Sequence, residues 1–274
     1  MVDAATLAKG AALILEPGDV QVWLAEPELA LRPESRRQME AVLSPDERDQ
    51  QRAFVSERHR AQYLVAHALV RFTLSRYIAR EPASWTFARS RYGRPEIACA
   101  SPVPLRFSLS HTDGLVGVAV AHVSDVGFDL EGTGRLVDPL GIAGRYFAPA
   151  EIAALQALPT EQQRQRFFEF WTLKEAYAKA RGFGLSLPLD QFFFEVGADG
   201  QPRVGFTADL QDAPDAWRFS LSRPTHAHCM ALAVRTTEAV PTPPPPPPAS
   251  APSTTTPKSP TQPLDGHAAG GLAE

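Results

Sequence analysis

The stretch FFEFWTLKEAYAKARGFGLSLPL, at residues 167–189, predicts a helix, an exit through glycine and a following strand. Phe167, Phe170, Leu173 and Tyr177 recur at helical spacing, so they would form one apolar stripe on that helix. A helix with such a stripe must pack against a sheet or a second helix. We therefore take this segment as the central element of its half of the chain.

A second face of the same helix carries Trp171, Glu175 and Lys179, each four residues from the next. Glu175 and Lys179 could form an ordinary surface ion pair, worth about 0.3–0.5 kcal/mol. Trp171 and the nearby Phe168 favour a covered face instead, where a glutamate and a lysine need a partner or a ligand. Gly182 is expected to end the helix.

Composition limits the class of protein. The chain has 274 residues, is 44% apolar and carries a net charge of −4, which is typical of a globular protein and too mild for a nucleic-acid partner. It has 2 cysteines, which fits a reducing, cytoplasmic location. No signal pattern and no apolar run of about 20 residues is present, so no membrane segment is expected.

The pattern along the chain predicts a mixed α+β protein. A capping box at Ser44 and Glu47, with Pro45 after the cap, should start a long helix that runs to about Ile78 with a break near Ser56. Two short helices are expected at 137–147 and 149–158. Strands are expected at 20–24, 85–88, 105–110, 115–121, 126–131, 191–196, 203–206, 217–221 and 229–234.

These elements suggest four parts. Residues 1–19 would be a loose arm, 20–122 and 123–238 two α+β lobes, and 239–274 a disordered tail. The tail holds 11 of the chain's 26 prolines, so it cannot bury enough apolar surface to fold. A helix followed by strands occurs in each half, which hints at two similar lobes.

One expected strand carries two acids. Asp129 and Glu131 alternate with Phe128 and Leu130, so both carboxylates project to one face. Two such carboxylates repel each other unless a cation lies between them, and Mg²⁺ suits oxygen ligands of this kind. An exposed strand edge that carries acids against aggregation is the alternative. Glu175 as a third carboxylate favours the metal site, and Lys179 could neutralise a phosphate bound to it.

A second candidate lies where another strand ends, at Ser110 and His111. The histidine alone would more often be structural. No Gly-x-Ser-x-Gly motif surrounds Ser110, so a hydrolase triad is disfavoured. The histidines also lack the spacing of a zinc motif.

Three segments together resemble one family. FSLSHTDGLVGVAV at 107–120, VGFDLE at 126–131 and FWTLKEAYAKARGFGLSLPL at 170–189 resemble the 4′-phosphopantetheinyl transferases, in their larger surfactin-type branch. The resemblance covers about residues 20–234. Phe128 stands where an aliphatic residue is usual, and it points away from the acids. The resemblance implies two similar α+β lobes with the active site in the cleft between them.

The resemblance also implies the reaction, which is transfer of the phosphopantetheine arm of coenzyme A to a serine of an apo acyl or peptidyl carrier protein. Magnesium, or manganese, would be held by Asp129, Glu131 and Glu175. Lys179 would bind the phosphate under attack, and Glu175, directly or through a water, would accept the serine proton. Carrier docking is expected near 137–158, and two lobes in one chain favour a monomer.

The resemblance places the remaining coenzyme A contacts on both lobes. Ser110, His111, Arg94 and either Arg58 or Arg60 would meet its phosphates. His111 would also be a catalytic residue, together with Glu175 and Lys179. Basic positions usual early in the long helix fall on Glu47 and Gln50, with Arg52 as a substitute.

Two other functions stay open. One is a magnesium-dependent hydrolase of a nucleotide diphosphate that uses the same carboxylates. The other is a non-enzymatic coenzyme A-binding regulator that acts through the proline-rich tail.

Overall fold

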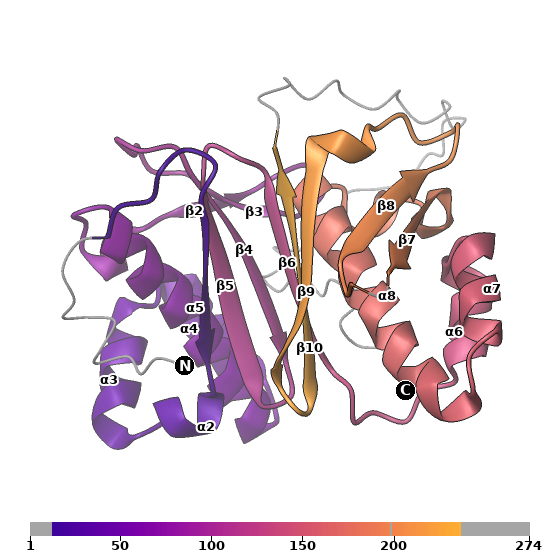
Figure 1. Ribbon diagram of the computed structural model, residues 1–274. Coiled ribbons are helices and arrows are strands. Elements are labelled where there is room, and N and C mark those ends of the chain that lie inside the picture. The colour runs from indigo at the N-terminus through magenta and orange to yellow at the C-terminus, as the bar shows by residue number, and fades with distance from the viewer. Residues whose placement is uncertain (1–12, 198, 237–274) are drawn as a thin grey trace, which may run out of the picture.

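The computed structural model describes residues 13–197 and 199–236, which form an α+β fold of two lobes (Figure 1). Each lobe is built on a three-stranded antiparallel sheet. The first sheet has the order β1 (Val20–Ala25), β5 (Leu115–His122), β4 (Leu105–Thr112), and the second has the order β6 (Val126–Gly132), β10 (His228–Arg235), β9 (Trp217–Thr225). Two small ribbons pair β2 (Phe87–Arg89) with β3 (Pro95–Ile97), and β7 (Phe192–Val196) with β8 (Pro202–Phe206).

Helices flank the strands on both sides. Those of the first lobe are α2 (Pro27–Ala30), α3 (Pro33–Val42), α4 (Pro45–Ala53) and α5 (Glu57–Tyr77). Those of the second are α6 (Pro139–Tyr146), α7 (Pro149–Gln156) and α8 (Thr160–Arg181). In Figure 1 the two groups lie at opposite sides of the central strands. The helices therefore cover the sheets and leave β4 and β6 to meet in the middle.

The start of the long helix and its break are as the sequence predicts. Ser44 Oγ accepts the backbone N–H of Glu47 at 3.2 Å, and Ser44 N donates to Glu47 Oε2 at 2.8 Å, which completes the capping box. Helix α4 ends at Ala53 and α5 starts at Glu57, so the predicted break near Ser56 is confirmed.

The two sheets are joined along β4 and β6 by side chains. Alternate hydroxyl groups on β4 accept backbone N–H groups of β6, so these hydroxyls replace the carbonyls of an ordinary ladder. The pairs are Phe128 N to Ser108 Oγ at 3.0 Å, Leu130 N to Ser110 Oγ at 3.2 Å, and Gly132 N to Thr112 Oγ1 at 3.1 Å. We call these three bonds the hydroxyl seam. The seam fixes the register of one lobe against the other.

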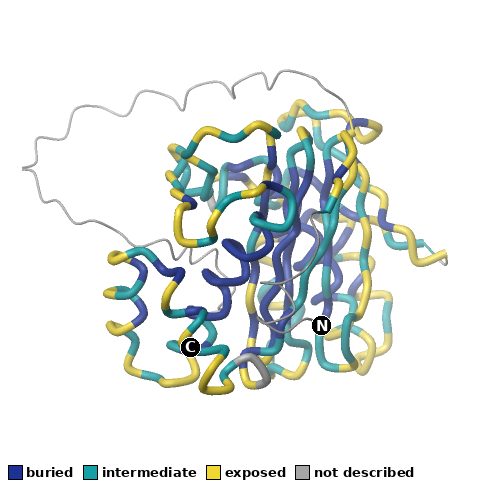
Figure 2. The backbone as a smooth tube through the Cα atoms, turned by 90° about the vertical axis from the view of Figure 1, so that its left-hand side faces the viewer, coloured by how far each residue is buried: buried dark blue, intermediate teal, exposed yellow. Residues whose placement is uncertain are grey.

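The strands where the lobes meet are mostly buried. Figure 2 shows the buried backbone concentrated in the central strands and the exposed backbone in the outer segments. Phe128 is fully buried in a small cluster that includes Leu115 and Leu130, which supports the prediction that it points away from the acids. Trp171 is 4% exposed and Glu175 5%, so the second face of α8 is covered, as its aromatic residues indicate.

Several sequence expectations need correction. Residues that follow α8 form two 3-10 turns, Gly184–Ser186 and Leu189–Gln191, and the strand expected there begins only at Phe192. Helices α2 and α3 were not predicted, although Pro27 and Pro33 each mark a helix start. The strand expected at 85–88 is Phe87–Arg89, and its partner Pro95–Ile97 was not predicted.

The described part of the N-terminal arm is attached to the first lobe. Leu13 N donates to Arg76 O at 2.7 Å, and His122 Nδ1 lies 2.8 Å from Leu15 O. Residues 1–12 and the tail at 239–274 lie outside the described residues, and the lobe boundaries stay predictions. No helix in the described ranges is both long and apolar enough to span a membrane.

Candidate functional site

The predicted site forms because α8 lies directly on β6. A Cβ atom added to Gly127 would come within 1.9 Å of Ala176 O and 2.4 Å of Ala180 N. Only glycine permits this approach of strand and helix backbones. Gly127 precedes Asp129 on the strand, while Ala176 and Ala180 follow Glu175 and Lys179 on the helix. The close packing therefore brings the two acidic motifs together.

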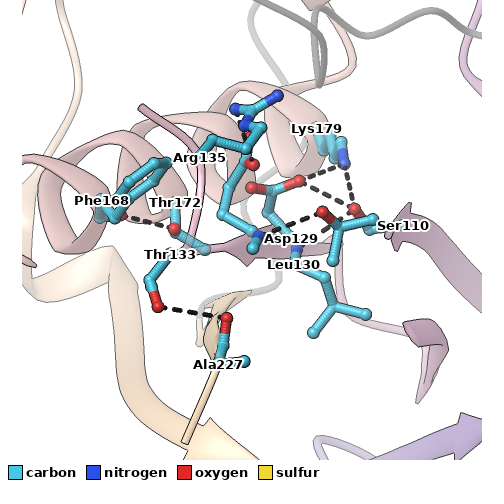
Figure 3. Close-up of polar contacts among 12 residues, drawn as sticks. Ser110, Asp129, Leu130, Thr133, Arg135, Phe168, Thr172, Lys179 and Ala227 are labelled. Carbon is cyan, nitrogen blue, oxygen red and sulfur yellow. Dashed lines mark hydrogen bonds and ion pairs between the residues drawn. The ribbon is translucent and has the colours of Figure 1, made fainter. Parts of the chain in front are cut away.

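Asp129 is the centre of the polar contacts in Figure 3. Its Oδ1 accepts Lys179 Nζ at 2.6 Å and Ser110 Oγ at 2.9 Å, and Lys179 Nζ also donates to Ser110 Oγ at 3.1 Å. The three side chains come from α8, β6 and β4, so both lobes contribute. Asp129 is 3% exposed, which strengthens its ion pair with Lys179 relative to a surface pair.

Glu131 and Glu175 belong to the same electrostatic cluster. Burial, and then the charge of Asp129, raises the pKa of Glu131 to about 8, against the opposing charges of Arg135 and Lys179. Burial and the charge of Asp129 also raise the pKa of Glu175 to about 7, which Lys179 opposes. Each acid therefore feels the charge of Asp129, and the cluster is short of positive charge.

The acidic cluster has oxygen atoms that could bind a cation. Asp129 Oδ2 and Glu131 Oε1 are buried without a hydrogen-bond partner, and buried carboxylate oxygens of this kind suit a divalent ion. In the described residues, no group of three or more Asp, Glu, His or Cys side chains is arranged to hold a metal as it stands. Lys179 and Arg135 instead lie against the other carboxylate oxygens. The carboxylate oxygens of the cluster are suitable ligands for a cation. In this structure Lys179 and Arg135 provide part of the positive charge that a metal ion would supply.

The other predicted residues lie around this cluster. His111 is exposed, and it alternates along β4 with the buried Ser110, so the strand does not bring it to the acids. Arg58 Nη1 pairs with Asp113 Oδ2 at 2.5 Å, beside the turn between β4 and β5. Arg94 donates to Glu96 at 2.8 Å and to Ala180 O at 2.9 Å, so it links the first lobe to the end of α8.

Arg60 faces a different part of the first lobe. It lines a groove of about 620 Å³, together with arginines of α3 and α4. The basic residues of this groove are Arg36, Arg37, Arg48, Arg52 and Arg60. Glu47 turns away from it and pairs inside with Arg71 at 2.7 Å and with His67 at 3.0 Å. Glu47, where the resemblance leads us to expect a basic residue, thus has a structural role, and the basic side chains lie on the groove face.

Sequence reasoning missed two features near the site. Arg135 Nη2 lies 3.2 Å from Glu131 Oε2, and only its four-residue spacing from that acid pointed to the contact. Lys174 is fully buried, 2.7 Å from the fully buried Glu151 of α7, and its Nζ also donates to Leu189 O and Phe192 O. The sequence signal for this buried lysine was its place one residue before Glu175, on a helix with two apolar faces.

Comparison with known proteins gives one family. The model of the 4′-phosphopantetheinyl transferase superfamily matches residues 125–233. A solved holo-(acyl-carrier-protein) synthase from Bacillus anthracis, in complex with CoA (3′,5′-ADP), is 18% identical with a TM-score of 0.34, over 40% of this chain and 94% of that one. The residues that the family model matches include β6 and most of the second lobe.

Two curated relatives extend the match into the first lobe. The 4′-phosphopantetheinyl transferase HetI of Nostoc sp. is 35% identical over 157 residues, 57% of this chain and 66% of HetI. The 4′-phosphopantetheinyl transferase Sfp of Bacillus subtilis is 31% identical over 175 residues, 64% of this chain and 75% of Sfp. The match to HetI thus spans just under two thirds of that protein, and the match to Sfp three quarters.

Proposed function

This chain belongs to the 4′-phosphopantetheinyl transferase family, and we propose that it transfers the phosphopantetheine arm of coenzyme A to a serine of an apo acyl or peptidyl carrier protein. The reaction would release 3′,5′-ADP. The two-lobed α+β fold and the acidic cluster between the lobes support this proposal.

One contact gives the main support for this proposed function. Lys179 Nζ lies 2.6 Å from Asp129 Oδ1, which joins the sequence motif on α8 to the motif on β6. Glu131 and Glu175 lie within the electrostatic reach of the same aspartate. A site with three buried acids and a lysine suits a substrate that brings its own negative charge together with a metal ion.

Asp129, Glu131 and Glu175 would hold Mg²⁺, or Mn²⁺, which both accept oxygen ligands. When bound, the ion would supply positive charge for the pyrophosphate of coenzyme A and for the leaving 3′,5′-ADP. The unpartnered oxygens of Asp129 and Glu131 support this assignment.

The chain's own groups provide the remaining steps. The carrier serine oxygen forms a bond to the β-phosphorus, and the bond from that phosphorus to the bridging oxygen breaks. Lys179 would release Asp129 and stabilise the transferring phosphate. Glu175, directly or through a water, would take the serine proton; because a carboxylate bound to Mg²⁺ is a weak base, the route through a water has equal weight.

The other proposed coenzyme A contacts are residues that lie around the acidic cluster. Ser110 lies against both Asp129 and Lys179, so its hydroxyl is beside the proposed pyrophosphate site. Arg94 would contact a phosphate from the lobe interface. His111, together with Arg58 or Arg60, would contact a phosphate from the α5 side of β4. Arg94 Nε and Nη2 both donate to Glu96 Oε1, so Arg94 would have to release Glu96 in order to bind that phosphate.

The carrier is expected to dock on α6 and α7, within 137–158. Leu136 just before α6 is 93% exposed and Tyr146 at its end is 45% exposed, so an apolar contact surface is available there. Because one chain supplies both lobes of the cleft, a monomer would suffice for activity.

The test is incubation of the protein with coenzyme A, Mg²⁺ and a panel of apo carriers, followed by intact-mass measurement of each carrier. We expect a gain of one phosphopantetheine arm on at least one carrier and none on its Ser→Ala variant. Rapid cleavage of coenzyme A without any carrier would instead indicate a hydrolase. Coenzyme A binding that is indifferent to Mg²⁺, with no transfer, would indicate a regulator.

A further inference from the structure

Glu131 is held by one of its two oxygens. Its Oε2 accepts Arg135 Nη2 at 3.2 Å, while its Oε1 is buried without a partner. The Glu131 side chain is 1% exposed, so neither oxygen is open to bulk water. Asp129 shows the same division, since Oδ1 is bonded to Ser110 and Lys179 and Oδ2 is free. Each acid thus has one oxygen fixed by a side chain and one left for another ligand.

Arg135 is itself held in place. Thr133, two residues earlier, donates its backbone N–H to Ala227 O at 2.8 Å and its hydroxyl to the same oxygen at 3.1 Å. The guanidinium carbon lies 5.9 Å from the ring centre of the buried Phe168 of α8 (Figure 3). The loop after β6 and the face of α8 therefore direct this arginine at Glu131.

We propose that Arg135 is a positioning residue of the metal site, which binds Glu131 Oε2 so that Oε1 stays available to a divalent cation. This inference rests on the proposed function of the acidic cluster. Carboxylates that bind metals are commonly oriented by a hydrogen bond to their second oxygen, and loss of that bond weakens metal binding by about 10–100-fold. Without Arg135 the buried carboxylate would be free to rotate.

An alternative role for Arg135 predicts the opposite effect on metal binding. If Arg135 only substituted for the cation, the two would compete for Glu131, and removal of the arginine would tighten metal binding. The position of Arg135 favours the positioning role. Its side chain is 34% exposed and contacts Glu131 Oε2, which leaves Oε1 without a partner. Both the arginine and a cation can therefore bind Glu131 at once.

The experiment measures Mn²⁺ binding to the purified full-length chain by the loss of the free-ion EPR signal, with and without coenzyme A. Arg135→Met removes the guanidinium but keeps an unbranched apolar side chain, and Arg135→Lys keeps a donor. Arg164→Ala is the control, because it removes an exposed positive charge from α8. A thermal melt of each variant shows that the fold is retained.

We expect Arg135→Met to weaken Mn²⁺ binding at least about tenfold, Arg135→Lys to recover part of that loss, and Arg164→Ala to stay within about twofold of wild type. Unchanged or tighter binding by Arg135→Met would overturn the inference and leave the metal site intact. A wild-type chain that does not bind Mn²⁺ even with coenzyme A would overturn the metal site, and the inference with it.

Discussion

Ser110 and Leu130 lie on different lobes, and the Ser110 hydroxyl accepts the Leu130 backbone N–H at 3.2 Å. The same hydroxyl donates to Asp129. The bond that aligns the lobes therefore also fixes a residue of the proposed metal site. Ser108 and Thr112 form the corresponding interlobe bonds on either side of Ser110, to Phe128 and Gly132.

The outer rungs of the hydroxyl seam should contribute to stability. Ser108→Ala and Thr112→Val each leave a backbone N–H of β6 without its acceptor, which should cost about 1–3 kcal/mol where that group is buried. Urea unfolding followed by circular dichroism measures the change. Ser222→Ala, an exposed serine on β9, is the matched control and should change stability by less than about 0.5 kcal/mol. Losses at Ser108 and Thr112 no larger than the control would mean that the seam does not hold the lobes.

The approach of α8 to β6 should depend on Gly127. Gly127→Ala places a methyl group 1.9 Å from Ala176 O, so the helix must move and the fold should lose about 3 kcal/mol or more. Gly134→Ala is the control, since an added Cβ there meets nothing within 4 Å. Thermal unfolding compares the two variants. Equal melting temperatures would contradict the close packing that assembles the site.

The buried pair of Lys174 and Glu151 should show strong coupling. Lys174→Met leaves a buried carboxylate unpaired, which should cost about 3–5 kcal/mol, whereas the double change Lys174→Met with Glu151→Met should cost less than the sum of the two single changes. The exposed pair of Arg203 and Asp199 is the comparison, and its loss should cost about 0–1 kcal/mol. A double-mutant cycle in urea gives both coupling energies. Additive effects at Lys174 and Glu151 would show that the pair is not a unit.

Acid stability should depend on Glu47. Burial alone raises the pKa of Glu47, but the hydrogen bond and charge of His67 and the charge of Arg71 outweigh burial and lower it to about 2, from an ordinary 4.5. A lowered pKa contributes stability that is complete above pH 4.5 and is lost as the pH falls toward 2. Between these limits the wild type should lose about 3 kcal/mol more than Glu47→Gln.

Unfolding measured at several pH values across this window tests that slope. Glu34→Gln, an exposed acid on α3, should follow the wild type. Parallel curves for the wild type and Glu47→Gln would contradict the assignment.

Local patterns were sufficient to predict the parts of the site but not their contacts. Strand alternation placed Asp129 and Glu131 on one face, and the four-residue spacing placed Glu175 and Lys179 on another. The ion pair between Lys179 and Asp129 depends on how α8 packs, which Gly127 permits but no periodicity specifies.

The missed contacts join segments distant in the sequence or depend on the path of a loop. Glu151 meets Lys174 only after α7 folds against α8, and Arg135 reaches Glu131 because the loop after β6 turns back. His111 adjoins Ser110 in sequence, but strand alternation separates their side chains. Alternation was used to pair Asp129 with Glu131, and the same rule would have separated Ser110 from His111.

The proposed function requires the acids between the lobes for transfer of the arm of coenzyme A. The most direct measurement is the rate of carrier modification by Glu175→Gln, followed by intact mass at saturating Mg²⁺, with a thermal melt to show that the variant is folded. We predict a folded protein whose rate falls by about 10²-fold or more, because Glu175 is both a proposed metal ligand and the proposed base. A folded Glu175→Gln protein that modifies the carrier at nearly the wild-type rate would contradict the account.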